Sequence, residues 1–168
     1  MTSHPAEKLA MRPLLPADVP LLAEIFRASV EELTGDDYDE AQQQAWATSA
    51  EDEEGFGARL AQELTLVATH DGDAVGFAAL ADNTRIDMLY VHPAASGRGA
   101  GSMLCEALEK LAAGRGSREV SVEASDSARG FFEQRGYVAT SRNTVFRGGE
   151  WLANTTMVKP LGPAERPS

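Results

Sequence analysis

The chain has 168 residues, of which 43% are hydrophobic and 24% charged, so it can bury a sizeable core like an ordinary globular protein. Its net charge of −11 argues against nucleic acid as a partner, and the sequence shows neither a membrane-spanning apolar run nor a signal peptide. A single cysteine, Cys105, fits a reducing compartment, and three scattered histidines have no metal-ligand spacing. We therefore expect a cytoplasmic protein that binds no metal, no nucleic acid and no membrane.

The first third of the chain is predicted to be mostly helical. A short strand at 9–14 precedes a helix that begins at 16–18 and ends at Thr34-Gly35, with apolar residues every three or four positions. A short helix is expected at 42–46 and a third over 51–64, whose acidic first turn suits the helix dipole. We expect residues 9–160 to form one domain, with flexible tails at 1–8 and 161–168.

The acidic residues are unevenly placed. Thirteen Asp or Glu residues lie between positions 18 and 63 against two arginines, so this segment carries the whole net charge. Solvated helix faces explain such an excess. The alternative is a negatively charged entrance to a binding site, here called the negative mouth, that attracts a cationic amine. Tyr38 and Trp46 belong to the same segment, and they either pack in the core or line an acceptor pocket.

After residue 64 the periodicity changes to that of strands. Alternating or apolar runs at 64–70, 74–80 and 86–91 are joined by short turns, which predicts an antiparallel meander. A helix over 103–112 then leads to a strand at 119–124, and a crossover of this length normally joins parallel strands. A helix over 126–135 and a hairpin of 137–145 with 151–158 follow. The sheet is therefore expected to be mixed, with a ligand crevice where the two parallel strands diverge.

A glycine-rich turn links the third strand of the meander to its helix. Residues 86–102 read IDMLYVHPAASGRGAGS, in which Gly97, Gly99 and Gly101 stand just before the helix. Glycines let a phosphate approach the backbone, and the first N–H groups of a helix favour an anion. The turn lacks the lysine of a P-loop. A Rossmann fingerprint needs glycine at its first, third and sixth positions, and counted from Gly97 the sixth position is Ser102, so this motif does not fit either.

Together with the preceding LYVHP, the turn Ser96-Gly97-Arg98-Gly99-Ala100-Gly101 resembles the acyl-CoA-binding motif of the GNAT N-acetyltransferase superfamily, although Ser96 stands where Gln or Arg is usual. Residues 125–137 are similar to the second family signature. Ala128 and Gly136 match it, Ser125 replaces an Asn, and Phe132 replaces a Tyr. The run RNTVFRGGEWLANTTMVK also looks like the YafP-like branch. The resemblance covers about residues 9–160.

The resemblance implies an α/β (α+β) fold, with a mixed, mostly antiparallel sheet of about six to seven strands flanked by helices. It also implies acetyl-CoA as cosubstrate, with Arg98, Arg129 and Arg135 as partners of its phosphates. The residues assigned to acyl-CoA in this way are Leu89, Tyr90, Val91, Ser96, Gly97, Arg98, Gly99, Ala100, Gly101, Ser102, Ser125, Ser127, Ala128, Phe131, Phe132 and Arg135.

The implied reaction is direct attack of a primary amine, on a small molecule or peptide, on the thioester in a ternary complex. The backbone N–H of Leu89, next to an expected bulge, would polarise the thioester oxygen. Asp87, Glu123 and Tyr38 are candidates for accepting the proton of the amine. By the period of two, Asp87 and Leu89 are expected on one face of the strand, and Met88 and Tyr90 on the other.

In many family members the hydroxyl of the second signature is thought to protonate the departing thiolate, and Phe132 has none. Either another group, such as Ser127 or Tyr90, supplies this proton, or coenzyme A leaves as a thiolate. A non-catalytic acyl-CoA-binding or sensing module is therefore the alternative to an enzyme. The last hairpin often mediates dimers in this fold, so a homodimer is a further expectation.

Overall fold

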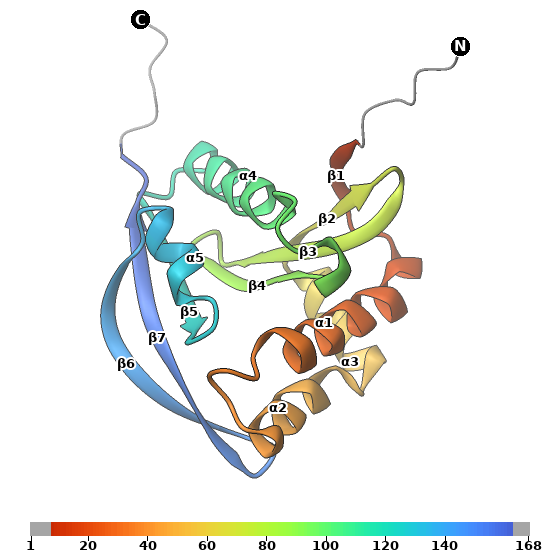
Figure 1. Cartoon of the computed structure of the whole chain (residues 1–168). Helices are drawn as coiled ribbons and strands as arrows, with labels where there is room; N and C mark the ends of the chain where they lie inside the picture. The colour runs from red at the N-terminus through yellow and green to blue at the C-terminus, as the bar shows by residue number, and fades with distance from the viewer. Residues whose placement is uncertain (1–7, 163–168) are drawn as a thin grey trace, which may run out of the picture.

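The computed structural model describes residues 8–162 and contains one seven-stranded sheet with helices on both faces (Figure 1). The predicted tails at 1–8 and 161–168 lie outside the described residues except for Lys8, Leu161 and Gly162. The strands are β1 (Leu9–Pro13), β2 (Leu64–His70), β3 (Asp73–Ala81), β4 (Arg85–Val91), β5 (Glu119–Ser125), β6 (Val138–Arg147) and β7 (Glu150–Pro160). The helices are α1 (Val19–Leu33), α2 (Glu40–Ala47), α3 (Glu53–Gln62), α4 (Ala100–Gly114) and α5 (Arg129–Gln134).

The sheet has the order β1-β2-β3-β4-β5-β7-β6. All neighbouring strands are antiparallel except β4 and β5, which α4 connects. The predicted mixed sheet, with its meander, one parallel crossover and a final hairpin, is therefore confirmed. Consecutive strands joined by tight turns pair antiparallel, whereas a helix crossover returns the chain in the same direction.

Two hydrophobic clusters lie on opposite faces of the sheet. Leu22, Phe26 and Leu60 belong to the cluster beneath α1, α2 and α3, and Leu104 and Leu108 to the cluster beneath α4 and α5. Figure 1 shows α1–α3 gathered on one side and α4 with α5 on the other. The apolar face predicted for the first helix is thus the face that packs on the sheet.

Several boundaries differ from the predicted ones by one to three residues, and two of these differences lie near the cleft described below. The helix expected from position 126 begins at Arg129, because the N–H of Ala128 is bonded to the backbone oxygen and the Oγ of Ser125 in a preceding turn. The final hairpin is longer than 137–145 and 151–158. It reaches Arg147 and Glu150, which pair across the two-residue turn Gly148-Gly149.

Candidate functional site

Strand β4 carries a bulge at Asp87. Met88 pairs with Ala79 and Ile86 with Leu80, so Asp87 has no partner in β3. The extra residue reverses the alternation of side chains. Ile86 and Leu89 pack with the cluster beneath α4, whereas Met88 and Tyr90 pack with the cluster beneath α1. Asp87, the bulged residue, binds Arg59 of α3 on the side of α1, so the prediction that Asp87 and Leu89 share a face by the period of two is wrong.

The bulge also decides where the backbone groups of β4 point. The N–H of His92 donates to the carbonyl oxygen of Val75 at 2.8 Å. This bond shows which residues of β4 direct their backbone groups toward β3. In an antiparallel ladder alternate residues face the neighbouring strand, so Leu89 and Val91 direct their N–H and C=O groups away from β3. Pairing between β4 and β5 ends at Ile86 and Val122. The backbone groups of Leu89 and Val91 therefore face the gap between the diverging strands.

The glycine-rich turn lies at the beginning of α4. Gly97 and Gly99 have positive φ values of 81° and 91°, which only glycine adopts readily, and no atom lies within 4 Å of a Cβ built on either. The first bond of the helix runs from the N–H of Met103 to the oxygen of Gly99 at 3.0 Å. The preceding N–H groups of the turn thus have no partner within the helix, and the surface above them is open to an anion.

Helix α5 is joined to this turn through Arg135. Its guanidinium donates to the oxygen of Phe131 at 2.7 Å and to the hydroxyl of Ser102, and it lies 3.6 Å above the Phe131 ring. A Cβ on Gly101 would approach that ring to 3.2 Å, so a larger residue there would require the ring to shift. Ser127, in contrast, donates its hydroxyl to Asp37 at 2.8 Å.

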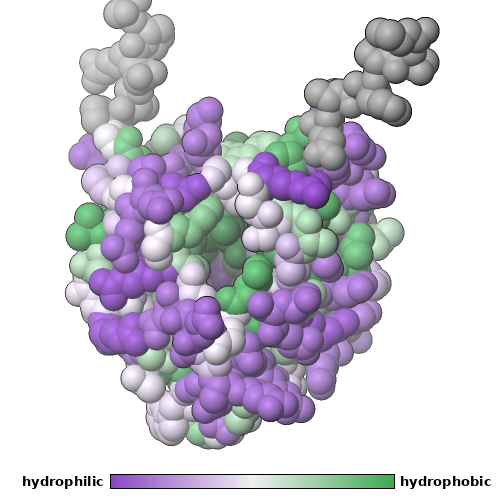
Figure 2. All heavy atoms as spheres, viewed as in Figure 1, coloured by the Kyte–Doolittle hydropathy of each residue, from purple (hydrophilic) through white to green (hydrophobic). Residues whose placement is uncertain are grey.

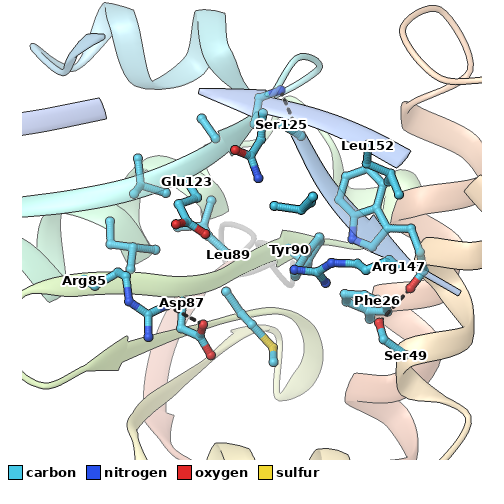
Figure 3. Close-up of a pocket in the computed structure, with 18 of the residues that line it drawn as sticks. Phe26, Ser49, Arg85, Asp87, Leu89, Tyr90, Glu123, Ser125, Arg147 and Leu152 are labelled. Atoms are coloured by element: carbon cyan, nitrogen blue, oxygen red, sulfur yellow. Dashed lines mark hydrogen bonds and ion pairs between the residues drawn. The ribbon is translucent and has the colours of Figure 1, made fainter. Parts of the chain in front are cut away.

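A cavity of about 250 Å³ opens where β4 and β5 diverge. Figure 2 shows the hollow on this face of the molecule, and Figure 3 shows the side chains around it. Predicted site residues that line it are Tyr38, Trp46, Asp87, Leu89, Tyr90, Glu123, Ser125, Ala128 and Phe132. The remaining predicted residues, which are Val91, Ser96, Gly97, Arg98, Gly99, Ala100, Gly101, Ser102, Ser127, Phe131 and Arg135, do not line the cavity. They lie at the end of β4, in the glycine turn and the first turn of α4, and in or next to α5.

Several lining residues were not predicted from the sequence. They are Phe26, Ser49, Phe56, Arg59, Arg85, Met88, Val145, Arg147, Leu152 and Asn154, besides further backbone neighbours of the predicted set. They come from α1, the turn Thr48–Ala50 after α2, α3, β4 and the final hairpin, which are far apart in the sequence. Only the Gly148-Gly149 turn, directly after Arg147, signals in the sequence that this arginine ends a strand.

Asp87 is held by two arginines. Its carboxylate accepts bonds from Arg59 Nε and Nη2 at 2.8 and 2.6 Å, and from Arg85 Nη1 at 2.7 Å. These donors and Glu63 hold the pKa of Asp87 below its usual range, although burial opposes them as the largest influence. Burial and the neighbouring Asp87 raise the pKa of Glu63 to about 8. The environment therefore favours the proton on Glu63 rather than on Asp87.

Tyr38 connects three segments through its hydroxyl. The hydroxyl donates to the backbone oxygen of Ala153 at 2.6 Å and accepts from the N–H of Asp126 at 2.9 Å. Its ring packs edge-on against Trp46, with 5.4 Å between the ring centroids. Burial, the largest influence, raises the pKa of Tyr38. The hydroxyl of Tyr38 is thus engaged with the backbone of two other segments at the wall of the cavity.

Tyr90 forms part of the cavity wall in the middle of an aromatic group. Its ring packs against Phe26, Trp46 and Phe77, with centroid distances of 4.7, 6.5 and 5.8 Å. Burial raises the pKa of Tyr90 to about 12, so its hydroxyl stays protonated at neutral pH. The cavity wall around Tyr90 is consequently aromatic.

None of the thirteen acidic residues between positions 18 and 63 lines the cavity, and Arg59 is the only charged residue of that segment that does. The lining therefore does not support the interpretation of this segment as a negative mouth. The charged side chains at the cavity are Arg59, Arg85, Asp87, Glu123 and Arg147. Within residues 8–162 the structure has no cluster of three or more metal-ligating side chains and no helix that is long and apolar enough to cross a membrane.

Comparisons with known proteins agree with this geometry. The family described as "Acetyltransferase (GNAT) domain" matches residues 34–159. The N-acetyltransferase YafP of Escherichia coli K12 is 32% identical over 149 residues, which cover 89% of this chain and 94% of YafP. A GCN5-related N-acetyltransferase from Rhodopseudomonas palustris is 55% identical with a TM-score of 0.90, covering 94% and 99% of the two chains. The PaiA N-acetyltransferase of Thermoplasma acidophilum, solved with coenzyme A, is 20% identical with a TM-score of 0.75, covering 91% and 99%. At that identity the likeness is one of fold.

Proposed function

The chain belongs to the GNAT family of acetyltransferases, and from this premise we propose that it transfers an acetyl group from acetyl-CoA to a primary amine by direct attack in a ternary complex. The acceptor is a small molecule or a peptide. The observation that carries the proposal is the gap between β4 and β5, because the backbone donors of Leu89 and Val91 face it next to the glycine turn of α4.

The glycine turn is the proposed site for the pyrophosphate of acetyl-CoA. Its open surface at Gly97 and Gly99 and its N–H groups without helical partners support this assignment. Ser96 is exposed at the rim, where it offers a shorter donor than the Gln or Arg that is usual in the family. Arg135 holds the first turn of α4 through Ser102, so it acts as a positioning residue, and Arg98 and Arg129 are the proposed partners of the phosphates.

The backbone N–H of Leu89 is the proposed donor to the thioester oxygen, with Tyr90 and Val91 alongside the pantetheine arm. A fixed backbone donor costs no reorganisation when negative charge develops on that oxygen. Holding the amine and the thioester together in one small cavity also lowers the entropic cost of forming the bond between them. Ser125, Ala128, Phe131 and Phe132 form the proposed opposite wall of the cosubstrate site.

Glu123 is the proposed general base. It lines the cavity on β5, and its carboxylate bonds to no other side chain within residues 8–162. Asp87 is the other carboxylate at the cavity, but two arginines already hold it as an anion of low pKa, which makes it a poor proton acceptor. We assign Asp87 and Tyr38 to supporting the site, and Trp46 to the wall that contacts the acceptor.

Phe132 is 3% exposed and lines the cavity without offering a proton. Coenzyme A therefore departs as a thiolate in this proposal and takes a proton from solvent. Ser127 is engaged with Asp37, and Tyr90 is packed among aromatic rings, so neither is well suited to replace the missing hydroxyl.

Calorimetric titration with acetyl-CoA and a coenzyme A release assay test the proposal. Gly99→Ala should weaken acetyl-CoA binding at least about tenfold, because it disturbs the N–H groups of the turn. Gly72→Ala is the matched control, since Gly72 has the same φ of 91° and the same open surroundings but lies between β2 and β3. Equal acetyl-CoA affinity in both variants would contradict the pyrophosphate site. Binding without coenzyme A release on any amine would contradict catalysis.

We further propose that the protein is cytoplasmic and dimerises through its last hairpin. Phe146 and Trp151 support the dimer, because they are 59% and 60% exposed and pack on one another with 4.9 Å between ring centroids. Analytical ultracentrifugation of the wild type and of Trp151→Ser tests it, since a dimer through this patch should dissociate in the variant. A monomeric wild type at micromolar concentration would contradict it.

A further inference from the structure

The charged side chains at the cavity differ in whether they have a hydrogen-bond or ion-pair partner within the protein. Asp87 is bound by Arg59 and Arg85, which are thereby also engaged. Arg147 and Glu123 also line the cavity, yet neither side chain makes a hydrogen bond or ion pair with another residue in the range 8–162. Two opposite charges are therefore left for groups that come from outside the protein.

Arg147 is held in place by the end of the final hairpin. Gly148 and Gly149 have φ values of 54° and 86°, as a two-residue turn that follows the twist of the strands requires. A Cβ on Gly148 would lie 3.0 to 3.2 Å from Ala45, so the hairpin tip is pressed against α2. The backbone at Arg147 is thus held by the turn and by its packing against α2.

The alternation of side chains along the hairpin turns Arg147 toward the cavity. Val145 and Leu152 pair across the strands on the cavity side, whereas Phe146 and Trp151 pair on the exposed side. Arg147 lies two residues from Val145 and shares its side. In Figure 3 its guanidinium extends into the cavity beside Tyr90, and the carboxylate of Glu123 enters from the opposite wall near Leu89.

Arg147 is close enough to Tyr90 to act on it electrostatically. Its positive charge opposes the rise of the Tyr90 pKa that burial causes. Glu150 lies opposite Arg147 in the register, yet the two form no ion pair. The planar guanidinium therefore keeps its donors available above the aromatic wall, and this fork suits the two oxygens of a carboxylate.

We propose that the acceptor carries a carboxylate besides its amine, that Arg147 binds this carboxylate, and that the amine lies toward Glu123 and Leu89. The acceptor class is thus a small amino acid or a related amino carboxylate. A cavity of about 250 Å³, which the reactive end of the cosubstrate must share, limits its size. The inference rests on the proposed acetyl transfer and adds the substrate class at the same site.

Coenzyme A release with matched pairs of acceptors tests the inference. The probes are glycine, β-alanine, 4-aminobutyrate and L-methionine, each against its primary amide, with spermidine as a purely cationic amine. At least one acid should have a kcat/KM about tenfold or more above that of its amide, since a charge-assisted hydrogen bond is lost in the amide. Arg147→Met should lower kcat/KM for that acid by a similar factor and leave the amide within about twofold.

Two further variants separate binding of the carboxylate from general damage. Arg147→Lys keeps the charge but not the fork, so it should retain part of the preference for the acid. Arg142→Met is the control, because Arg142 lies on the same strand, pairs with Asp126 and does not line the cavity. It should not change the acid-to-amide ratio.

The possible outcomes distinguish this inference from the proposed function. Turnover of spermidine or of the amides that equals or exceeds turnover of the acids would overturn the inference and leave acetyl transfer intact. An equal loss for acid and amide in Arg147→Met would also overturn it. No coenzyme A release with any of these probes, from protein that binds acetyl-CoA, would count against both.

Discussion

Arg59 of helix α3 donates hydrogen bonds to both carboxylate oxygens of Asp87, from Nε and Nη2 at 2.8 and 2.6 Å. These two bonds connect the helix to the bulge of β4. The bulge is the feature that turns the N–H of Leu89 into the gap between β4 and β5. The pair thus holds the part of the backbone on which the proposed chemistry depends.

Removing the charge of Asp87 should therefore cost stability. Its side chain is 4% exposed and its partners are nearly half exposed, so Asp87→Asn should lower the free energy of unfolding by about 1–3 kcal/mol. Urea unfolding measures the loss. Glu133→Gln, which breaks the exposed pair with Arg129, is the control and should cost less than about 0.5 kcal/mol. If Asp87→Asn abolished turnover with unchanged stability, Asp87 would be the general base.

Glu63 should make stability depend on pH. Its pKa is raised from 4.5 to about 8 by burial and by Asp87, so between these values the folded chain keeps a proton that the unfolded chain has released. The free energy of unfolding contributed by this group therefore falls as pH rises through that window. Glu63→Gln should remove the fall, because the amide can still donate to Asp87. It should gain more stability over the wild type at pH 8 than at pH 5.

The measurement is urea unfolding of both proteins at the two pH values. Glu119→Gln, an exposed glutamate at the start of β5, serves as the control and should follow the wild type. If the free energy of unfolding changed with pH equally in the wild type and in Glu63→Gln, Glu63 would not hold the extra proton in the folded state.

Glu123→Gln should lower kcat by about 10²–10⁴, because the amine would lose the group that accepts its proton. Acetyl-CoA affinity should remain unchanged, since the glycine turn is untouched. Glu119→Gln is again the matched control, because it lies on the same strand but does not line the cavity. Steady-state kinetics with a saturating amine checks the prediction. A Glu123→Gln enzyme with wild-type kcat would assign proton removal to water or to another group.

Cys105 should be inert in the folded protein. It is fully buried, and this burial, with Glu109 nearby, raises the pKa of its thiol to about 12. At pH 8 the thiolate is scarce, so alkylation should be at least about a thousandfold slower than that of a free thiol. Labelling with iodoacetamide, followed by mass spectrometry with and without denaturant, measures the ratio. Rapid labelling of the native protein would reveal frequent opening of α4.

The sequence by itself determined the antiparallel meander, the parallel crossover, the final hairpin and the place of the glycine turn, but not that β1 pairs with β2 or that β7 lies between β5 and β6. Its periodicities distinguish helix from strand, a two-residue turn forces neighbouring strands to be antiparallel, and the α4 crossover forces β4 and β5 to be parallel. Gly97 and Gly99 could also be recognised locally, because a positive φ before a helix restricts the choice of residue.

Only the tertiary structure decided which side chains meet at the cavity. The bulge at Asp87 arises from pairing with β3, and it reversed the face on which Leu89 was expected. Arg59 and Arg147 lie 88 positions apart, and the placement of Arg147 depends on β6 running two residues beyond the predicted end at position 145. Local patterns report the neighbours along a strand or helix, whereas charge pairing and side-chain convergence depend on register and on packing between distant elements.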